Sequence, residues 1–190
     1  MCSVFIISHF SKMLYASFVR PEGIYSSWFN KAAAFCTGRG DFCHSEFIFR
    51  WDNEQREQVL SRVKGFAGLR HVEGAVDVAV YVLWGDQVRY RILNGAGEFW
   101  SVPEKDTIKI GLKWEQELNL VTWLSHQIGK QYDTTGALLC PFHWRKEDLA
   151  YDRYFCSQLM GVALKRQGYL TYCNPGGLSP NSLFAALKTH

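Results

Sequence analysis

The alternation of hydrophobic and polar residues predicts several β-strands in the first half of the chain. Residues 12–20 (KMLYASFVR) and 41–51 (DFCHSEFIFRW) each show the two-residue period of a strand whose two faces differ. Residues 76–93 contain two further runs of this kind around WGDQ, which predicts a β-hairpin. In the strand at 41–51, one face carries Phe42, His44, Glu46 and Ile48, and the other carries Cys43, Ser45, Phe47 and Phe49.

Hydrophobic residues spaced by three and four positions predict helices in the second half. Residues 113–133 give one apolar stripe, made of Trp114, Leu118, Val121, Leu124 and Ile128. Residues 152–168 predict a shorter amphipathic helix that begins near Tyr154 or Phe155 and ends at Gly168. A terminal helix begins with Ser179 as N-cap and Pro180 in the first turn, and packs through Leu183, Phe184 and Leu187.

Weaker signals complete the predicted order of elements. Residues 21–40 predict a short helix with Ser26 or Ser27 as N-cap and Gly38 and Gly40 after its end. Residues 53–66 predict a polar surface helix, and residues 134–154 a loop or partial helix. Because the chain shows no repeat and no Pro- or Ser-rich linker, we expect residues 1–190 to form one α+β domain.

Composition narrows the classes of function. Hydrophobic residues make up 47% of the chain, as in folded proteins, and the net charge of +3 is mild and scattered, so nucleic-acid binding is not expected. The apolar run at residues 1–19 is broken by His9, Ser11 and Lys12, which predicts neither a signal peptide nor a membrane span. We therefore expect a cytoplasmic protein whose six cysteines are reduced. Because these cysteines form no Cys-x-x-Cys pair, neither a metal nor a cofactor is predicted.

Cys156 is the first candidate for chemistry. It stands at the predicted start of a helix, where unsatisfied N–H groups and the helix dipole favour a thiolate and offer donors to an oxyanion. The same position on the edge of an apolar stripe also suits an inert, buried cysteine. A nucleophilic thiol needs a base, and His44 differs from the other histidines because Glu46 lies on the same strand face. Taken alone, a His-x-Glu pair is more often an exposed polar stripe.

Three stretches together resemble a known superfamily: GDFCHSEFIF, GKQYDTTGALL and YFCSQLM, followed by a terminal Ser-Pro-x-x-Leu segment. Their order is similar to that of the circularly permuted branch of the NlpC/P60 superfamily of papain-like cysteine hydrolases, over about residues 13–187. This branch includes bacterial YiiX-like hydrolases, lecithin:retinol acyltransferase-like enzymes and a family of poxvirus proteins. The resemblance implies a papain-like fold, in which an antiparallel sheet or small barrel packs against helices that include the nucleophile helix.

The resemblance also implies roles for individual residues. Cys156 would be the nucleophile and His44 the general base. The family generally takes its third polar residue from the strand beside the histidine, whereas Glu46 lies on the histidine strand itself, so Glu46 and Asp77 both stay open for that role.

Three further residues are expected near the substrate. Tyr132 and Asp133 match the family's Tyr-Asp segment, and Ser157 follows the nucleophile. We expect them to line the site, although a structural turn explains the Tyr-Asp pair equally well.

The implied reaction is thiol-dependent hydrolysis of the peptidase or amidase type, on a peptide, amide or acyl-lipid substrate. One alternative is an acyltransferase or lipid (thio)esterase, although that branch typically uses a second histidine and often a membrane anchor. Another is a non-catalytic viral structural or interaction protein, located in the host cytoplasm or the virion. An apolar acyl pocket could be lined by Trp28, Trp51, Trp84, Trp100 and Trp144, which core packing explains more often.

Overall fold

A five-stranded antiparallel sheet organises the described part of the chain. The computed structural model describes residues 13–22, 27–28, 30–31, 34, 41–93, 106–142 and 151–190. The strands lie in the order β4-β3-β2-β1-β5, so that the histidine strand is central. Their bounds are β1 (Met13–Val19), β2 (His44–Trp51), β3 (Val76–Val82), β4 (Val88–Leu93) and β5 (Thr107–Ile110).

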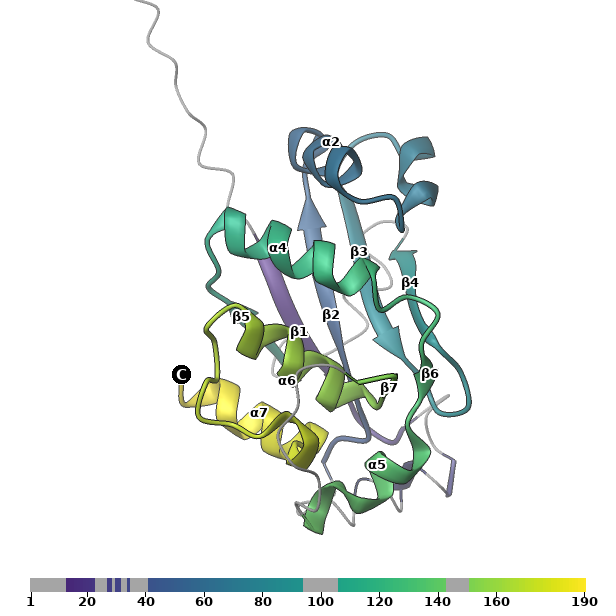
Figure 1. Cartoon of the computed structure of the whole chain (residues 1–190), viewed down its shortest axis with the longest axis vertical. Helices are drawn as coiled ribbons and strands as arrows, with labels where there is room; N and C mark the ends of the chain where they lie inside the picture. Colours follow the sequence, from purple (N-terminus) through teal and green to yellow (C-terminus); the bar gives the residue numbers. More distant parts are fainter. Residues whose placement is uncertain are drawn as a thin grey trace, which may run out of the picture.

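Helices cover one face of this sheet (Figure 1). The helices of the described residues are α2 (Asn53–Arg62), α4 (Trp114–Ser125), α5 (Thr134–Leu139), α6 (Cys156–Arg166) and α7 (Pro180–Lys188). Of these, α4 and α6 lie across this face, whereas α5 lies beyond the lower end of the sheet in Figure 1. Two short parallel strands, β6 (Gln131–Tyr132) and β7 (Arg153–Tyr154), join the segment after α4 to the segment before α6. The predicted α+β class is therefore confirmed.

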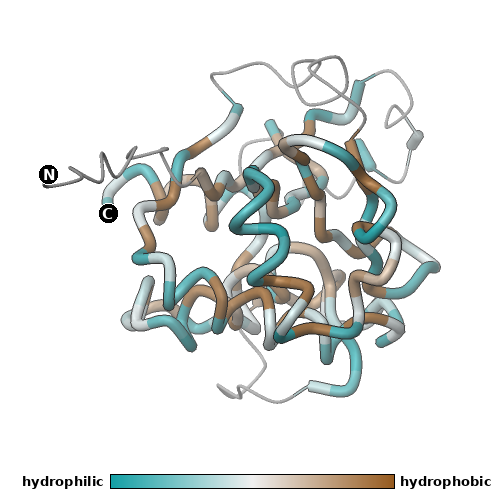
Figure 2. Tube along the Cα trace, turned by 90° about the horizontal axis from the view of Figure 1, so that it is seen from above, coloured by the Kyte–Doolittle hydropathy of each residue, from teal (hydrophilic) through white to brown (hydrophobic). Residues whose placement is uncertain are grey.

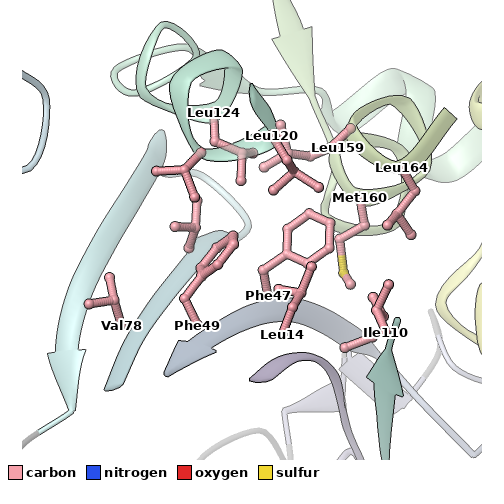
Figure 3. Close-up of a cluster of buried hydrophobic side chains, with 14 of the residues drawn as sticks. Leu14, Phe47, Phe49, Val78, Ile110, Leu120, Leu124, Leu159, Met160 and Leu164 are labelled. Carbon is pink, nitrogen blue, oxygen red and sulfur yellow. The ribbon is translucent and has the colours of Figure 1, made fainter. Parts of the chain in front are cut away.

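The main core lies between the sheet and helices α4 and α6. Phe47 and Phe49 of β2 point toward Leu120 of α4 and Met160 of α6, among the side chains drawn in Figure 3. All of these residues are almost completely buried, and burying such a side chain contributes about 1.5–3 kcal/mol to stability. Hydrophobic and hydrophilic residues are interspersed along the Cα trace in Figure 2.

The opposite face of the sheet carries a smaller apolar cluster and the polar side chains of interest. Ile48, Ala79 and Leu93 form that cluster, with Tyr15 and Tyr81 packed against it. His44 and Glu46 precede Ile48 at two-residue spacing on β2, and both are buried. The predicted assignment of His44, Glu46 and Ile48 to one face therefore agrees with the cluster that contains Ile48, because Phe47 and Phe49 belong to the main core.

Most predicted elements are confirmed, with differences at their ends. The hairpin around WGDQ is β3–β4, and Gly168 follows α6 with a φ of 78°, the left-handed conformation that favours glycine there. Helix α4 ends at Ser125, so Ile128 lies in the following turn rather than on the helical stripe. Strand β5 was not predicted, because a four-residue strand is specified mainly by its pairing with β1.

The helix predicted for residues 21–40 lies mostly outside the described residues, as do residues 1–12 of the apolar run at 1–19. Ser27 nevertheless makes the contact of an N-cap, because its hydroxyl accepts a hydrogen bond from the amide of Asn30 at 3.2 Å. Within the described ranges, no helix combines the length and apolar character needed to cross a bilayer.

Candidate functional site

Cys156 is the first residue of α6 and is 6% exposed. The N-cap position is Phe155, whose side chain has no hydrogen-bonding group with which to cap the first turn. The side-chain oxygen of Gln158 accepts from the amide of Phe155 at 3.4 Å. The helix start thus presents N–H groups and the positive end of the helix dipole close to the thiol.

Helix α6 is held against the segment that leads into α7. The hydroxyl of Ser157 donates to the carbonyl of Leu178 at 2.6 Å and is completely buried. At Gly161 the two segments approach so closely that an added Cβ would lie 2.7 Å from a methyl group of Leu178. The side chain expected of Ser157 in substrate binding is therefore engaged in anchoring the helix. Its backbone N–H takes a different part, because it helps to lower the pKa of the Cys156 thiol.

His44 is the first residue of β2, opposite Val19 of β1. The segment just before it is held on two sides. The amide of Cys43 donates to the carbonyl of Val19 at 3.0 Å, and Asn181 of α7 exchanges two hydrogen bonds with the backbone of Phe42, at 3.1 and 3.2 Å. These bonds place the imidazole at the end of the sheet where α6 begins.

The structure brings His44, Glu46 and Cys156 together in a buried cluster. Nε2 of His44 lies 3.9 Å from Oε2 of Glu46, and the ring also hydrogen-bonds the sulfur of Cys156. Burial alone would lower the pKa of His44. The hydrogen bond with Cys156, the contact with Glu46 and the negative charges of both groups outweigh burial and raise that pKa to about 9.

The pKa of Cys156 moves in the opposite direction from the pKa values of its neighbouring thiols. Burial would raise it, but the hydrogen bond and charge of His44, with backbone N–H donors from Ser45 and Ser157, lower it. Burial raises the pKa of Cys43 and of Cys140 to about 12 each, and the charge of Cys156 adds to the effect. Of the four described cysteines, all of which are free thiols, Cys156 alone is placed to ionise.

The Tyr-Asp segment divides into one residue near the thiol and one structural residue. Tyr132 is close enough to Cys156 for the thiolate to add to the effect of burial, and both raise the pKa of the tyrosine. Its ring contacts that of Trp84, with ring centres 5.3 Å apart. Asp133 is the N-cap of α5, where its carboxylate accepts from the amide of Gly136 at 2.8 Å. That bond gives Asp133 a structural role in capping α5, and its expected role in lining the site stays a prediction.

Asp77, the alternative third residue, is placed elsewhere. It lies opposite Arg50 in the β2–β3 register and accepts two hydrogen bonds from that guanidinium, at 2.8 and 2.7 Å. Arg50 is six residues along β2 from His44, about 20 Å in an extended strand. Asp77 is therefore part of a structural ion pair, and Glu46 is the acid beside the imidazole.

Two contributors were missed by the sequence analysis. The backbone N–H of Ser45 helps to lower the pKa of the Cys156 thiol, and Arg91 of β4 contacts Glu46 at 3.3 Å. A backbone donor leaves no trace in the residue type, and Arg91 reaches Glu46 only through the pairing of three strands. The predicted tryptophans also separate: Trp51 is buried in the core, Trp84 lies at the surface, and Trp100 and Trp144 are outside the described residues.

Among the described residues, no three His, Cys, Asp or Glu side chains gather in an arrangement that would hold a metal ion. Comparisons of the chain with models of known protein families, with curated proteins and with solved structures found no match. The chemistry of the site therefore rests on its geometry.

Proposed function

We propose that the protein is a thiol-dependent hydrolase of the peptidase or amidase type, with Cys156 as nucleophile and His44 as general base and acid. The observation that carries the proposal is the buried contact between a thiol at a helix start and a strand imidazole that also contacts a carboxylate. This arrangement also supports a permuted papain-like fold, because in that class the histidine strand precedes the cysteine helix.

The proposed reaction follows from these positions. The thiolate of Cys156 attacks the carbonyl carbon of the substrate, and a new C–S bond forms as the carbonyl oxygen becomes an oxyanion. N–H groups at the start of α6 stabilise that charge. The C–N or C–O bond then breaks, and the imidazolium of His44 gives its proton to the leaving amine or alcohol. Water, deprotonated by His44, attacks the resulting thioester and releases the acid and the thiolate.

A second candidate is acyl transfer or lipid ester hydrolysis at the same thiol. The observation that favours it is the set of exposed apolar side chains on the two segments beside Tyr132: Trp84, Leu138, Leu139 and Phe142. Trp84 contacts Tyr132 directly, and α5 follows Tyr132 after one residue. Such a surface suits a hydrocarbon chain better than a polar peptide.

Trapping of the acyl-enzyme tests the proposal. The protein is incubated with p-nitrophenyl esters of short and long acyl chains and with peptidyl coumarin amides, and intact mass spectrometry follows the acyl group on Cys156. We expect an adduct in the wild type and in Cys140→Ala, a matched buried thiol, but none in Cys156→Ala. Release of free acid identifies a hydrolase, whereas transfer to an added amine or alcohol identifies an acyltransferase.

The amide and ester substrates also distinguish the two candidate functions. Turnover of amides favours the peptidase or amidase, and turnover confined to long-chain esters favours the lipid enzyme. If Cys156→Ala is acylated and turns over substrate as fast as the wild type, Cys156 is not the nucleophile. If the folded wild type forms no adduct with any member of the panel, the hydrolase proposal fails, and a non-catalytic role is favoured.

A further inference from the structure

Glu46 stands between two cationic groups. Its Oε2 faces Nε2 of His44 at 3.9 Å, and its Oε1 accepts a hydrogen bond from Nη2 of Arg91 at 3.3 Å. The side chain of Glu46 is 3% exposed, whereas that of Arg91 is 43% exposed. One carboxylate oxygen is thus directed to the site and the other to a guanidinium at the surface.

The sheet explains how Arg91 reaches Glu46 across an intervening strand. Arg91 of β4 lies opposite Ala79 of β3, and Ala79 lies opposite Ile48 of β2, two residues from Glu46. Ala79 is small, so the arginine can extend over it toward the neighbouring position on β2. The guanidinium also lies over the ring of Tyr81, 5.4 Å from its centre, which restricts its orientation.

The carboxylate of Glu46 needs such a partner to act on His44. A buried carboxylate that lacks cationic partners tends to take up a proton or turn toward water, since leaving it charged is costly. A carboxylate that had turned or been protonated would no longer favour the imidazolium. The guanidinium keeps its charge at all ordinary pH values and offers a planar set of donors suited to a carboxylate.

We propose that Arg91 is a positioning residue for the Cys156–His44 pair, and that it acts by holding the carboxylate of Glu46 directed at the imidazole. The role assigned to the pair rests on the proposed function, but the effect of Arg91 on the pair can be measured without any substrate. Arg91 itself contacts neither Cys156 nor the reacting atoms.

Two effects of removing Arg91 have opposite signs, which makes the proposal testable. The loss of a nearby positive charge would by itself raise the pKa of His44. The loss of a correctly placed Glu46 carboxylate would lower that pKa and raise the pKa of Cys156. If Arg91 acts through Glu46, the second effect dominates.

The experiment compares Arg91→Gln, Arg91→Lys and Arg89→Gln in the full chain. Arg89 is the matched control, because it lies on the same face of β4 but pairs with Asp86 at 2.9 Å instead of Glu46. The titration of the ¹⁵N-labelled imidazole of His44 is followed by NMR, and the alkylation rate of Cys156 by mass spectrometry as a function of pH. Thermal unfolding reports whether each variant is folded.

We expect the pKa of His44 to fall by about one unit in Arg91→Gln. The pKa of Cys156 should rise at the same time, so that at a pH below it the alkylation of Cys156 slows by up to about tenfold for each unit of that rise. Arg91→Lys should recover part of both, and Arg89→Gln should change neither. In a Glu46→Gln background, Arg91→Gln should cause no further fall. A His44 pKa that rises or stays constant in Arg91→Gln overturns the inference.

If Arg91→Gln proves unstable, Arg91→Lys and the double variant with Glu46→Gln still test whether Arg91 acts on His44 through Glu46. The two proposals also fail separately. If the protein is not acylated but Arg91→Gln still lowers the pKa of His44, the hydrolase proposal fails and the positioning role of Arg91 stands. If the protein is acylated but the His44 titration is unchanged in Arg91→Gln, the hydrolase proposal stands and the positioning role fails.

Discussion

Strand β2 carries polar groups at both ends, and comparing them shows what distinguishes the candidate site. At the Trp51 end, Arg50 donates two hydrogen bonds to Asp77, and the indole of Trp51 donates one to Glu117 of α4 at 2.9 Å. At the other end, His44 lies between Glu46 and Cys156. The polar groups at both ends are largely buried, and at both ends they form ion pairs or hydrogen bonds with one another.

The difference lies in where the protons can go. The hydrogen bond to Asp77 raises the pKa of Arg50 against the opposing effect of burial, so the guanidinium never loses its proton, and an indole does not titrate in this range. At the His44 end, a thiol whose pKa is lowered meets an imidazole whose pKa is raised, and one proton can be held by either group. Fixed ionisation stabilises a fold, whereas an exchangeable proton can support catalysis.

The largest predicted effect is a difference in reactivity among the thiols of Cys43, Cys140 and Cys156, near the His44 end of β2. At pH 7 we expect iodoacetamide to alkylate Cys156 at least about 1000-fold faster than Cys43 or Cys140. Their pKa values of about 12 leave almost no thiolate, and each pKa unit is a tenfold change. Site-resolved mass spectrometry measures the three rates. Similar slow rates at all three would contradict the contrast between the two ends of β2.

Removing the imidazole should erase that contrast. In His44→Gln, burial of the Cys156 thiol is no longer opposed by a cation, so its pKa should rise toward the range of Cys43. We expect the alkylation rate of Cys156 at pH 6 to fall at least about 100-fold. Circular dichroism checks that the variant is folded, and His71→Gln, an exposed histidine, serves as the control. An unchanged rate would show that helix α6 activates the thiol without the histidine.

Removing the acid at the Trp51 end should lower the stability of the fold but leave the reactivity of Cys156 unchanged. Asp77→Asn takes away the charge that Arg50 binds, and we expect it to lower the free energy of unfolding by about 1–2 kcal/mol. Alkylation of Cys156 should stay within twofold of the wild type. Urea unfolding and the labelling rate measure the two effects. Glu115→Gln, in the exposed Arg62–Glu115 pair, is the control that should leave stability unchanged. A large loss of thiol reactivity in Asp77→Asn would return Asp77 to the candidate catalytic residues.

The smallest effect concerns pH. The lowered pKa of Cys156 means that thiolate, and the stability it contributes, persist below the ordinary value of 9.0 and are lost as pH falls through the lowered pKa. The raised pKa of His44 means that the imidazolium contributes fully below its ordinary value of 6.5 and is lost as pH rises through about 9.

We therefore expect alkylation of Cys156 to reach a plateau below the pH at which a free thiol titrates. A second step, smaller than about tenfold, should follow near pH 9, where the imidazolium loses its proton. Stopped-flow or quenched labelling from pH 4 to 10 measures both steps. His44→Gln should lack the second step, and a single rise centred at pH 9 in the wild type would contradict the ion pair.

The sequence predicted elements whose signals are local. The starts of α6 and α7 and the end of α6 at Gly168 follow from capping residues and helical periodicity, and the structure confirms them. The two faces of β2 follow from the two-residue period. Strand β5 and the β6–β7 pair were missed, because two to four residues carry too little periodicity to be recognised without their partners.

The candidate site shows the same division. Periodicity alone puts His44 and Glu46 on one face of a strand, and the helix start alone singles out Cys156. The choice between Glu46 and Asp77 depended on the strand register, which places Asp77 opposite Arg50. The different uses of the Ser157 hydroxyl and amide, and the reach of Arg91 across β3, likewise depend on neighbours distant in the sequence.

By itself, the sequence determined the α+β class, the main helices and strands, and the residue types able to do thiol chemistry, because these depend on neighbours within a few positions. The tertiary structure decided which of those residues meet. Cys156 and His44 are 112 positions apart in the chain. Their contact is set by the packing of α6 on β2, the bond of Ser157 to Leu178 and the clamp of Asn181 on Phe42. Such long-range packing, and the pKa shifts that follow from burial, have no local signature in a sequence.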